Sequence, residues 1–140
     1  MHMNLADWQR PLAVAEIATG LGILLFWAAF FTIGLVPANA PPCYLAFEHS
    51  FPLPDGVLAA GLLAAGTLLR RGRAAGAALS LMCAGGLLFL GLIDVAFNLQ
   101  NGMYTASLAG GLAVAAINLW CIVLGSALAL AFVPTTRAQA

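Results

Sequence analysis

The fold is decided by residues 70–97, RRGRAAGAALSLMCAGGLLFLGLIDVAF. An arginine-rich turn precedes a long apolar run in which Asp94 is the single charged residue. A membrane-spanning helix needs about 20 predominantly apolar residues, so the run from Ala74 to Phe97 can cross a bilayer. Because Gly72 breaks the helix before it, this run is expected to return across the membrane as the second arm of a tight antiparallel hairpin.

The composition is typical of an integral membrane protein. Of the 140 residues, 63% are apolar and 7% are charged, whereas about a quarter of a soluble domain is charged. The net charge of zero also argues against nucleic acid as a partner. The sequence therefore predicts an all-α, polytopic membrane protein with a single domain, residues 1–140. This four-helix transmembrane bundle would have spans at about 12–36, 53–69, 74–97 and 106–133.

Prolines and glycines mark the expected ends of these helices. Pro11 suits the first turn of the first span, and Leu53-Pro54-Asp55 opens the second. Residues 38–54 form the longest stretch expected to be non-helical, and it should lie at the membrane interface. Asn101-Gly102 makes the last turn, and Pro134 with a short polar tail closes the chain.

The basic residues predict the orientation. If the spans alternate, all five arginines fall on one side of the membrane, namely Arg10, Arg70, Arg71, Arg73 and Arg137. The positive-inside rule makes that side cytoplasmic. We therefore expect a multi-pass protein of the bacterial cell inner membrane with both termini inside.

Acids in the outer half are the first candidates for a ligand-binding site. A carboxylate left charged in lipid costs at least ~2.5 kcal/mol, so Asp94 should face the bundle interior, take a proton, or bind a cation or polar ligand. A structural hydrogen bond explains Asp94 equally well. Asp55 is expected at a similar depth on the neighbouring helix, although stabilisation of the helix terminus is its simpler interpretation.

Glu48, Asn98 and Asn118 complete the candidate site. Glu48 and His49 could face the same pocket, but neighbours on an extended segment point opposite ways, which disfavours a metal site. A solvated loop pair is the simpler interpretation. Asn118 lies within the apolar fourth span, where its amide needs a partner. A helix–helix hydrogen bond would provide one. Asn98 lies one turn beyond Asp94 and extends its polar face.

The remaining polar residues have simpler expected roles. Glu16 should lie near the inner interface and pair with Arg10 or another arginine. Cys43, Cys83 and Cys121 occur singly, without the Cys-x-x-Cys spacing of a redox or zinc site. The sequence therefore predicts no metal site and identifies no cofactor.

Two family resemblances rest on residues 48–55, EHSFPLPD, and the hydrophobic helix that follows and ends in arginines. Over most of its length the chain resembles uncharacterised four-helix bacterial membrane proteins of the YvaD type, which implies a topology but no activity. The same stretch is similar to the EXPERA group of sterol isomerases and sigma-2-type receptors. That resemblance implies acids in a lipid-open pocket, with Glu48 as the matching acid. In contrast to the receptor-like members, the first span here has no acid in its outer half.

Three functions follow as hypotheses. The leading one is binding of a cation or a small amphipathic ligand in an outer-side acidic pocket lined by Asp94, Asp55, Glu48, Asn118 and Asn98. The second is a membrane-embedded isomerase-type enzyme in which a carboxylic acid protonates a lipid-soluble substrate. The third is a structural subunit whose small-residue helix faces dock onto a larger membrane complex or onto another copy of the chain.

Overall fold

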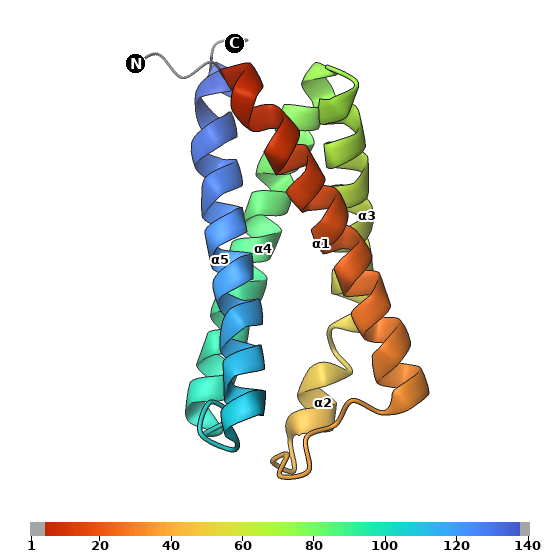
Figure 1. Ribbon diagram of the computed structural model, residues 1–140, viewed down its shortest axis with the longest axis vertical. Helices are drawn as coiled ribbons and strands as arrows, with labels where there is room; N and C mark the ends of the chain where they lie inside the picture. The colour runs from red at the N-terminus through yellow and green to blue at the C-terminus, as the bar shows by residue number, and fades with distance from the viewer. Residues whose placement is uncertain (1–4, 138–140) are drawn as a thin grey trace.

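The computed structural model describes residues 5–137, and the side chains of residues 8–133. The described part is all-helical, with α1 (Leu5–Ile33), α2 (Tyr44–Glu48), α3 (Pro52–Arg70), α4 (Ala74–Gln100) and α5 (Leu108–Arg137) (Figure 1). All of these helices except the short α2 are long and apolar enough to cross a membrane. The prediction of an all-helical chain with four such helices is confirmed.

The four long helices form a bundle that is closed at one end and open at the other (Figure 1). α3 packs between α1 and α4, and α5 packs along α4. α1 begins beside the C-terminal end of α5 and leans across the bundle toward α3. Contact between α1 and α5 is therefore slight, and the two helices diverge toward the end that carries α2.

Two glycines make the tight connections between the long helices. Gly72 has a φ of 65° between α3 and α4, and Gly102 has a φ of 66° between α4 and α5. This left-handed region is accessible to glycine because it has no Cβ. The predicted hairpin at residues 70–73 and the predicted turn at Asn101-Gly102 are both confirmed.

Four of the predicted helix boundaries are wrong. α4 continues past residue 97 to Gln100. α1 begins at Leu5, so Pro11 lies inside the helix rather than in its first turn. α1 also ends at Ile33 because Gly34 adopts a φ of 76°, which stops the helix before residue 36. α5 runs through Pro134 to Arg137. A proline inside a helix removes one backbone hydrogen bond and crowds the carbonyl group of residue i−4, which weakens or kinks a helix without always ending it.

Residues 38–54, predicted to be non-helical, contain α2. The preceding prolines end at Pro42, so the backbone N–H groups of the next residues are free to form one helical turn. Tyr44 is buried in an aromatic cluster with Trp27 and Phe30 of α1. The Phe47 ring stacks on Phe97 of α4 with 3.8 Å between ring centroids. Aromatic packing therefore holds α2 across the open end of the bundle.

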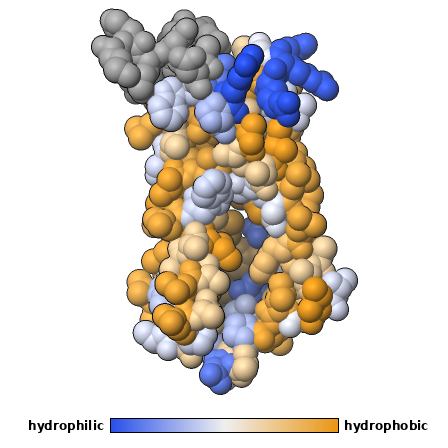
Figure 2. Space-filling model, in the orientation of Figure 1, coloured by the Kyte–Doolittle hydropathy of each residue, from blue (hydrophilic) through white to orange (hydrophobic). Residues whose placement is uncertain are grey.

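Close packing elsewhere depends on small residues. A Cβ added to Gly66 of α3 would lie 2.6 Å from the carbonyl oxygen of Ala13 in α1, so these two backbones touch. The same holds for Gly125 of α5, where a Cβ would lie 3.0 Å from the carbonyl oxygen of Ala84. Figure 2 shows apolar side chains over the flanks of the bundle and hydrophilic ones at the end with the α3–α4 turn. The flanks match the surface that a lipid bilayer requires.

Candidate ligand-binding site

A cavity of about 590 Å³ lies in the half of the bundle that contains α2. Every described helix contributes to its wall, and none of the described residues that line it is basic. We call it the acidic cavity, because its polar wall consists of Thr19, Tyr44, Glu48, Asp55, Asp94, Asn98 and Asn118. The structure thus brings all five residues singled out in the sequence to one space.

The acidic cavity opens sideways between α1 and α5. Figure 2 shows a hollow with a hydrophilic floor between two hydrophobic flanks. Phe26 of α1 and Ile117 of α5 line the cavity and also reach the outer surface, where Ile117 is 52% exposed. Both helices are candidate membrane spans, so this opening lies between two surfaces that suit lipid.

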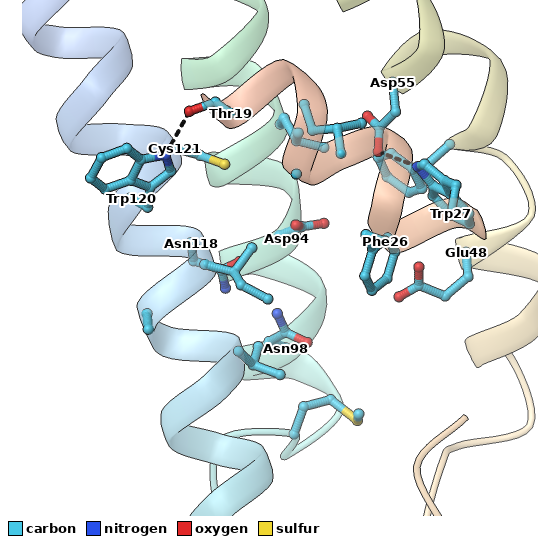
Figure 3. Close-up of a pocket in the computed structure, with 18 of the residues that line it drawn as sticks. Thr19, Phe26, Trp27, Glu48, Asp55, Asp94, Asn98, Asn118, Trp120 and Cys121 are labelled. Atoms are coloured by element: carbon cyan, nitrogen blue, oxygen red, sulfur yellow. Dashed lines mark hydrogen bonds between the residues drawn. The ribbon is translucent and has the colours of Figure 1, made fainter. Parts of the chain in front are cut away.

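One hydrogen bond closes the cavity at the end away from α2. The indole N–H of Trp120 in α5 donates to the hydroxyl of Thr19 in α1 over 3.0 Å (Figure 3). Cys121 lies next to this contact in the cavity wall and is 6% exposed. Beyond this point the interior is a closed apolar core that includes Leu12, Leu124 and Leu128.

Asp55 is fixed by a bond to another helix. It lies in the first turn of α3, as predicted, and is 9% exposed. Its Oδ2 atom accepts a buried hydrogen bond of 2.9 Å from the indole N–H of Trp27 in α1 (Figure 3). The simpler interpretation of Asp55 as a helix-terminal residue was therefore incomplete, because the side chain ties α3 to α1 beside the cavity.

Asp94 presents a carboxylate to the cavity from α4. Its side chain is partly exposed, and it lies within electrostatic range of Glu48 and Asp55. No residue of the described part of the chain donates a hydrogen bond to it. Figure 3 shows Asp94 facing the same space as Asn98 and Asn118. Asp94 is therefore the acid in the cavity whose charge has no protein partner.

Glu48 reaches the cavity from the last position of α2. Burial raises the pKa of this carboxyl, and the negative charge of Asp55 raises it further, while Tyr44 and His49 partly offset both effects. His49 lies outside the cavity wall and stacks on Phe31 of α1. The expectation of a solvated Glu48–His49 pair is wrong for Glu48, which the local helix turns into the cavity wall, whereas His49 is exposed.

The two asparagines line the floor of the cavity. The side-chain amide of Asn118 in α5 donates a 2.7 Å hydrogen bond to the hydroxyl of Tyr104, which lies in the α4–α5 connection. Its partner is thus in a turn, whereas the sequence favoured a bond to another helix. Asn98 is buried, one turn along α4 from Asp94, as its spacing predicts. Together they add amide dipoles to the acidic wall.

Aromatic rings cover much of the remaining wall. Phe26 and Trp27 come from α1, Phe47 from α2, and Phe51 from the residue that precedes α3. The negative face of an aromatic ring attracts a cation, most strongly where water is excluded. Carboxylates and aromatic rings in one lipid-facing cavity suit a ligand with a positive charge and an apolar surface.

The sequence interpretation missed several residues that shape the site. Glu16 is 0% exposed, and neither of its carboxylate oxygens has a hydrogen-bond partner, so the expected pairing with an arginine at the interface is wrong. The positions Ala13, Glu16, Gly20, Ile23, Trp27 and Phe30 are three or four residues apart. That spacing places them on one helix face and could have shown both Glu16 and Trp27 as interior.

The comparisons with known proteins add no relative. No protein-family model, no curated protein and no solved structure matches this chain. Within the described residues, no group of three or more histidine, cysteine or acidic side chains could hold a metal ion. All three cysteines are free. What the site can do must be argued from its own geometry.

Proposed function

We propose that this chain is a multi-pass protein of a bacterial inner membrane that binds a small amphipathic cation in the acidic cavity. The observation that carries the proposal is the convergence of Glu48, Asp55 and Asp94 on one open cavity whose described wall has no basic residue. Mutual repulsion of these carboxylates is relieved by a bound positive charge. Asp94 is the principal contact, because it has no partner within the described protein.

The shape of the cavity favours an organic cation over a bare metal ion. A volume of about 590 Å³ is within the range of sites for small organic ligands. The aromatic wall and the sideways opening suit a ligand that partitions into lipid and passes between α1 and α5. The five arginines at the opposite end support an orientation with both termini in the cytoplasm and the cavity in the outer half.

A pair of ions with matched shape tests this proposal. Tetraphenylphosphonium and tetraphenylborate share four phenyl groups and differ in the sign of their charge. Purified protein in lipid nanodiscs should bind the phosphonium saturably, beyond its partition into empty nanodiscs, and should not bind the borate. Equal binding of the two ions, or no saturable binding of either, would reject a cation site.

A second candidate function is favoured by the raised pKa of Glu48. A carboxyl group whose pKa is raised holds its proton more tightly and can act as a general acid. In an isomerase, Glu48 would protonate one carbon of an alkene, and a base would remove a proton from a neighbouring carbon, which shifts the double bond. Turnover of a sterol substrate in heavy water, with deuterium appearing in the product and lost in Glu48→Gln, would support this alternative.

A further inference from the structure

Glu16 is a buried acid that does not line the acidic cavity. It lies on α1 one turn beyond Thr19, on the side away from the cavity, and it is not part of the cavity wall. Its side chain is 0% exposed, and both carboxylate oxygens lack a hydrogen-bond partner. An orphaned carboxyl group in the closed part of the bundle needs an explanation.

Among the side chains that the structure describes, the helices around Glu16 offer it no positive charge. On α1 itself the nearest basic residue is Arg10, which is exposed. α3 carries its charged residues at its two ends, and its Gly66 packs against α1 one turn from Glu16. The part of α5 in the closed core is apolar, with Leu124 and Leu128.

α4 contributes the two polar neighbours of this carboxyl group. The Ser80 hydroxyl lies beside Glu16, and it donates its own proton to the carbonyl oxygen of Gly76 over 2.9 Å. The thiol of Cys83 is the other titratable group within electrostatic range. Neither group supplies a cation. The Ser80 oxygen still has a lone pair, so it can accept a hydrogen bond from a protonated carboxyl group.

We propose that Glu16 is a proton-binding site that controls how the first half of α1 sits in the bundle. An ionised carboxylate here would lose its water and gain no cation and at most the neutral hydroxyl of Ser80 in return. With a proton bound, its O–H donates to Ser80 of α4, and this part of α1 stays in place against α3. When the proton leaves, water must reach the carboxylate, and this part of α1 shifts so that Glu16 separates from Ser80.

This movement would act on the closed end of the acidic cavity. Thr19 is one turn from Glu16 on the same helix, and its contact with Trp120 joins α1 to α5. Displacement of this part of α1 therefore separates Thr19 from Trp120 and uncovers Cys121 behind them. The switch requires no ligand in the cavity, so its test does not depend on the proposed cation binding.

The chain contains only two glutamates, Glu16 and Glu48, which allows a direct measurement of the proton. Protein labelled with ¹³C at the glutamate carboxyl carbon should give two NMR signals, and Glu48→Gln identifies the signal of Glu16 without altering Glu16 itself. We expect the Glu16 signal to keep the position of a protonated acid to a higher pH than the signal of a solvated glutamate does, and to reach the carboxylate position as the pH is raised further. A carboxylate signal at neutral pH that persists in mildly acidic buffer would overturn the proton site.

Alkylation of Cys121 tests the movement. In protein with Cys43→Ser and Cys83→Ala, a lipid-soluble maleimide should modify Cys121 several-fold faster at alkaline pH than in the same protein carrying Glu16→Gln. Comparison at each pH cancels the ordinary ionisation of the thiol, because both proteins share it. Equal rates across the pH range would overturn the switch. Thermal unfolding of both proteins at neutral pH confirms that the glutamine variant is folded.

Discussion

The two ends of this bundle use the same four helices in opposite ways. At the end with the termini, α1 lies in a closed core, and the acid it contributes there, Glu16, is sealed from any opening. At the end with α2, α1 and α5 stand apart, and Glu48, Asp55 and Asp94 face an open cavity. The position of an acid along a tapered bundle therefore decides whether it meets a ligand or a protein interior.

The taper follows from the sizes of the residues on the packed face of α1. Ala13 and Gly20 come first, and each lies against the α3 backbone or its side chains at close range. Trp27 and Phe30 follow toward the α2 end, where their rings fill an aromatic cluster. Small residues let α1 approach α3 closely at the closed end, and the larger rings fill the wider space near α2.

The largest expected effect comes from removing the charge of Asp94. Asp94→Asn keeps the size of the side chain but loses the negative charge that has no protein partner. Interactions with a charged group contribute ~1.5–3 kcal/mol, so affinity for tetraphenylphosphonium should fall by roughly ten- to a hundredfold. Equilibrium binding in nanodiscs measures this change.

The matched control for Asp94 removes an equal charge at the opposite end. Asp7→Asn changes a residue in the first turn of α1, far along the helix from the cavity. It should leave tetraphenylphosphonium affinity within about twofold, since distant charges are screened. Equal losses in the two variants would show that net charge matters and that the cavity does not.

A glycine substitution at the closed end of the bundle tests how closely the helices pack there. Gly66→Ala puts a methyl group 2.6 Å from the carbonyl oxygen of Ala13, and overpacking of this kind costs roughly 1–3 kcal/mol. Gly85 of α4 has open space where its Cβ would lie, so Gly85→Ala should be neutral or slightly stabilising. Unfolding in a denaturing detergent compares the two variants. If Gly85→Ala were the more damaging change, the assignment of the closed end would be wrong.

Two tryptophan hydrogen bonds, one buried and one exposed, connect α1 to other helices. Trp27→Phe leaves Asp55 without its buried donor, which should cost about 1–2 kcal/mol of stability. Trp120→Phe removes an exposed bond to Thr19 and should cost less than about 1 kcal/mol. The same unfolding measurement ranks them. The reverse order would mean that α1 is held mainly by α5, contrary to its packing along α3.

The smallest expected effect is the pH dependence that Glu48 adds to binding. Because burial raises its pKa, Glu48 is protonated at a higher pH than an ordinary glutamate. A cation favours the ionised form, so affinity for tetraphenylphosphonium should rise as pH increases through the raised pKa. The folded protein without ligand should lose stability over the same interval, because the folded state holds this proton more tightly than the unfolded chain. In Glu48→Gln both steps should vanish, and their persistence would assign them to another acid.

Much of the fold could be predicted because lipid imposes strong rules on sequence. The long apolar runs and the left-handed turn at Gly72 sufficed for the helices and the hairpin. The helix ends predicted from Pro11 and Pro134 were wrong, because a proline can interrupt the backbone hydrogen bonds at one position without ending a helix. The short helix α2 depends on contacts with Trp27 and Phe97, which lie far away in sequence.

The site was only partly predictable. Asp94 and Asn98 were found because a polar residue in an apolar run needs a partner or a ligand. The bond between Trp27 and Asp55 could not be found this way, because helices apolar on all sides do not reveal which faces meet. Glu16 was misplaced because its distance from the helix end suggested the interface, whereas its spacing from Gly20 and Trp27 indicated the interior.

The most direct test of the acidic cavity is a crystal structure with tetraphenylarsonium, whose arsenic atom can be located by its anomalous scattering. The account predicts one strong peak inside the cavity, between the carboxylate of Asp94 and the acids Glu48 and Asp55, that disappears in crystals of Asp94→Asn. A peak only on the lipid-facing surface, or an unchanged peak in Asp94→Asn, would contradict the claim that these acids form a cation-binding site.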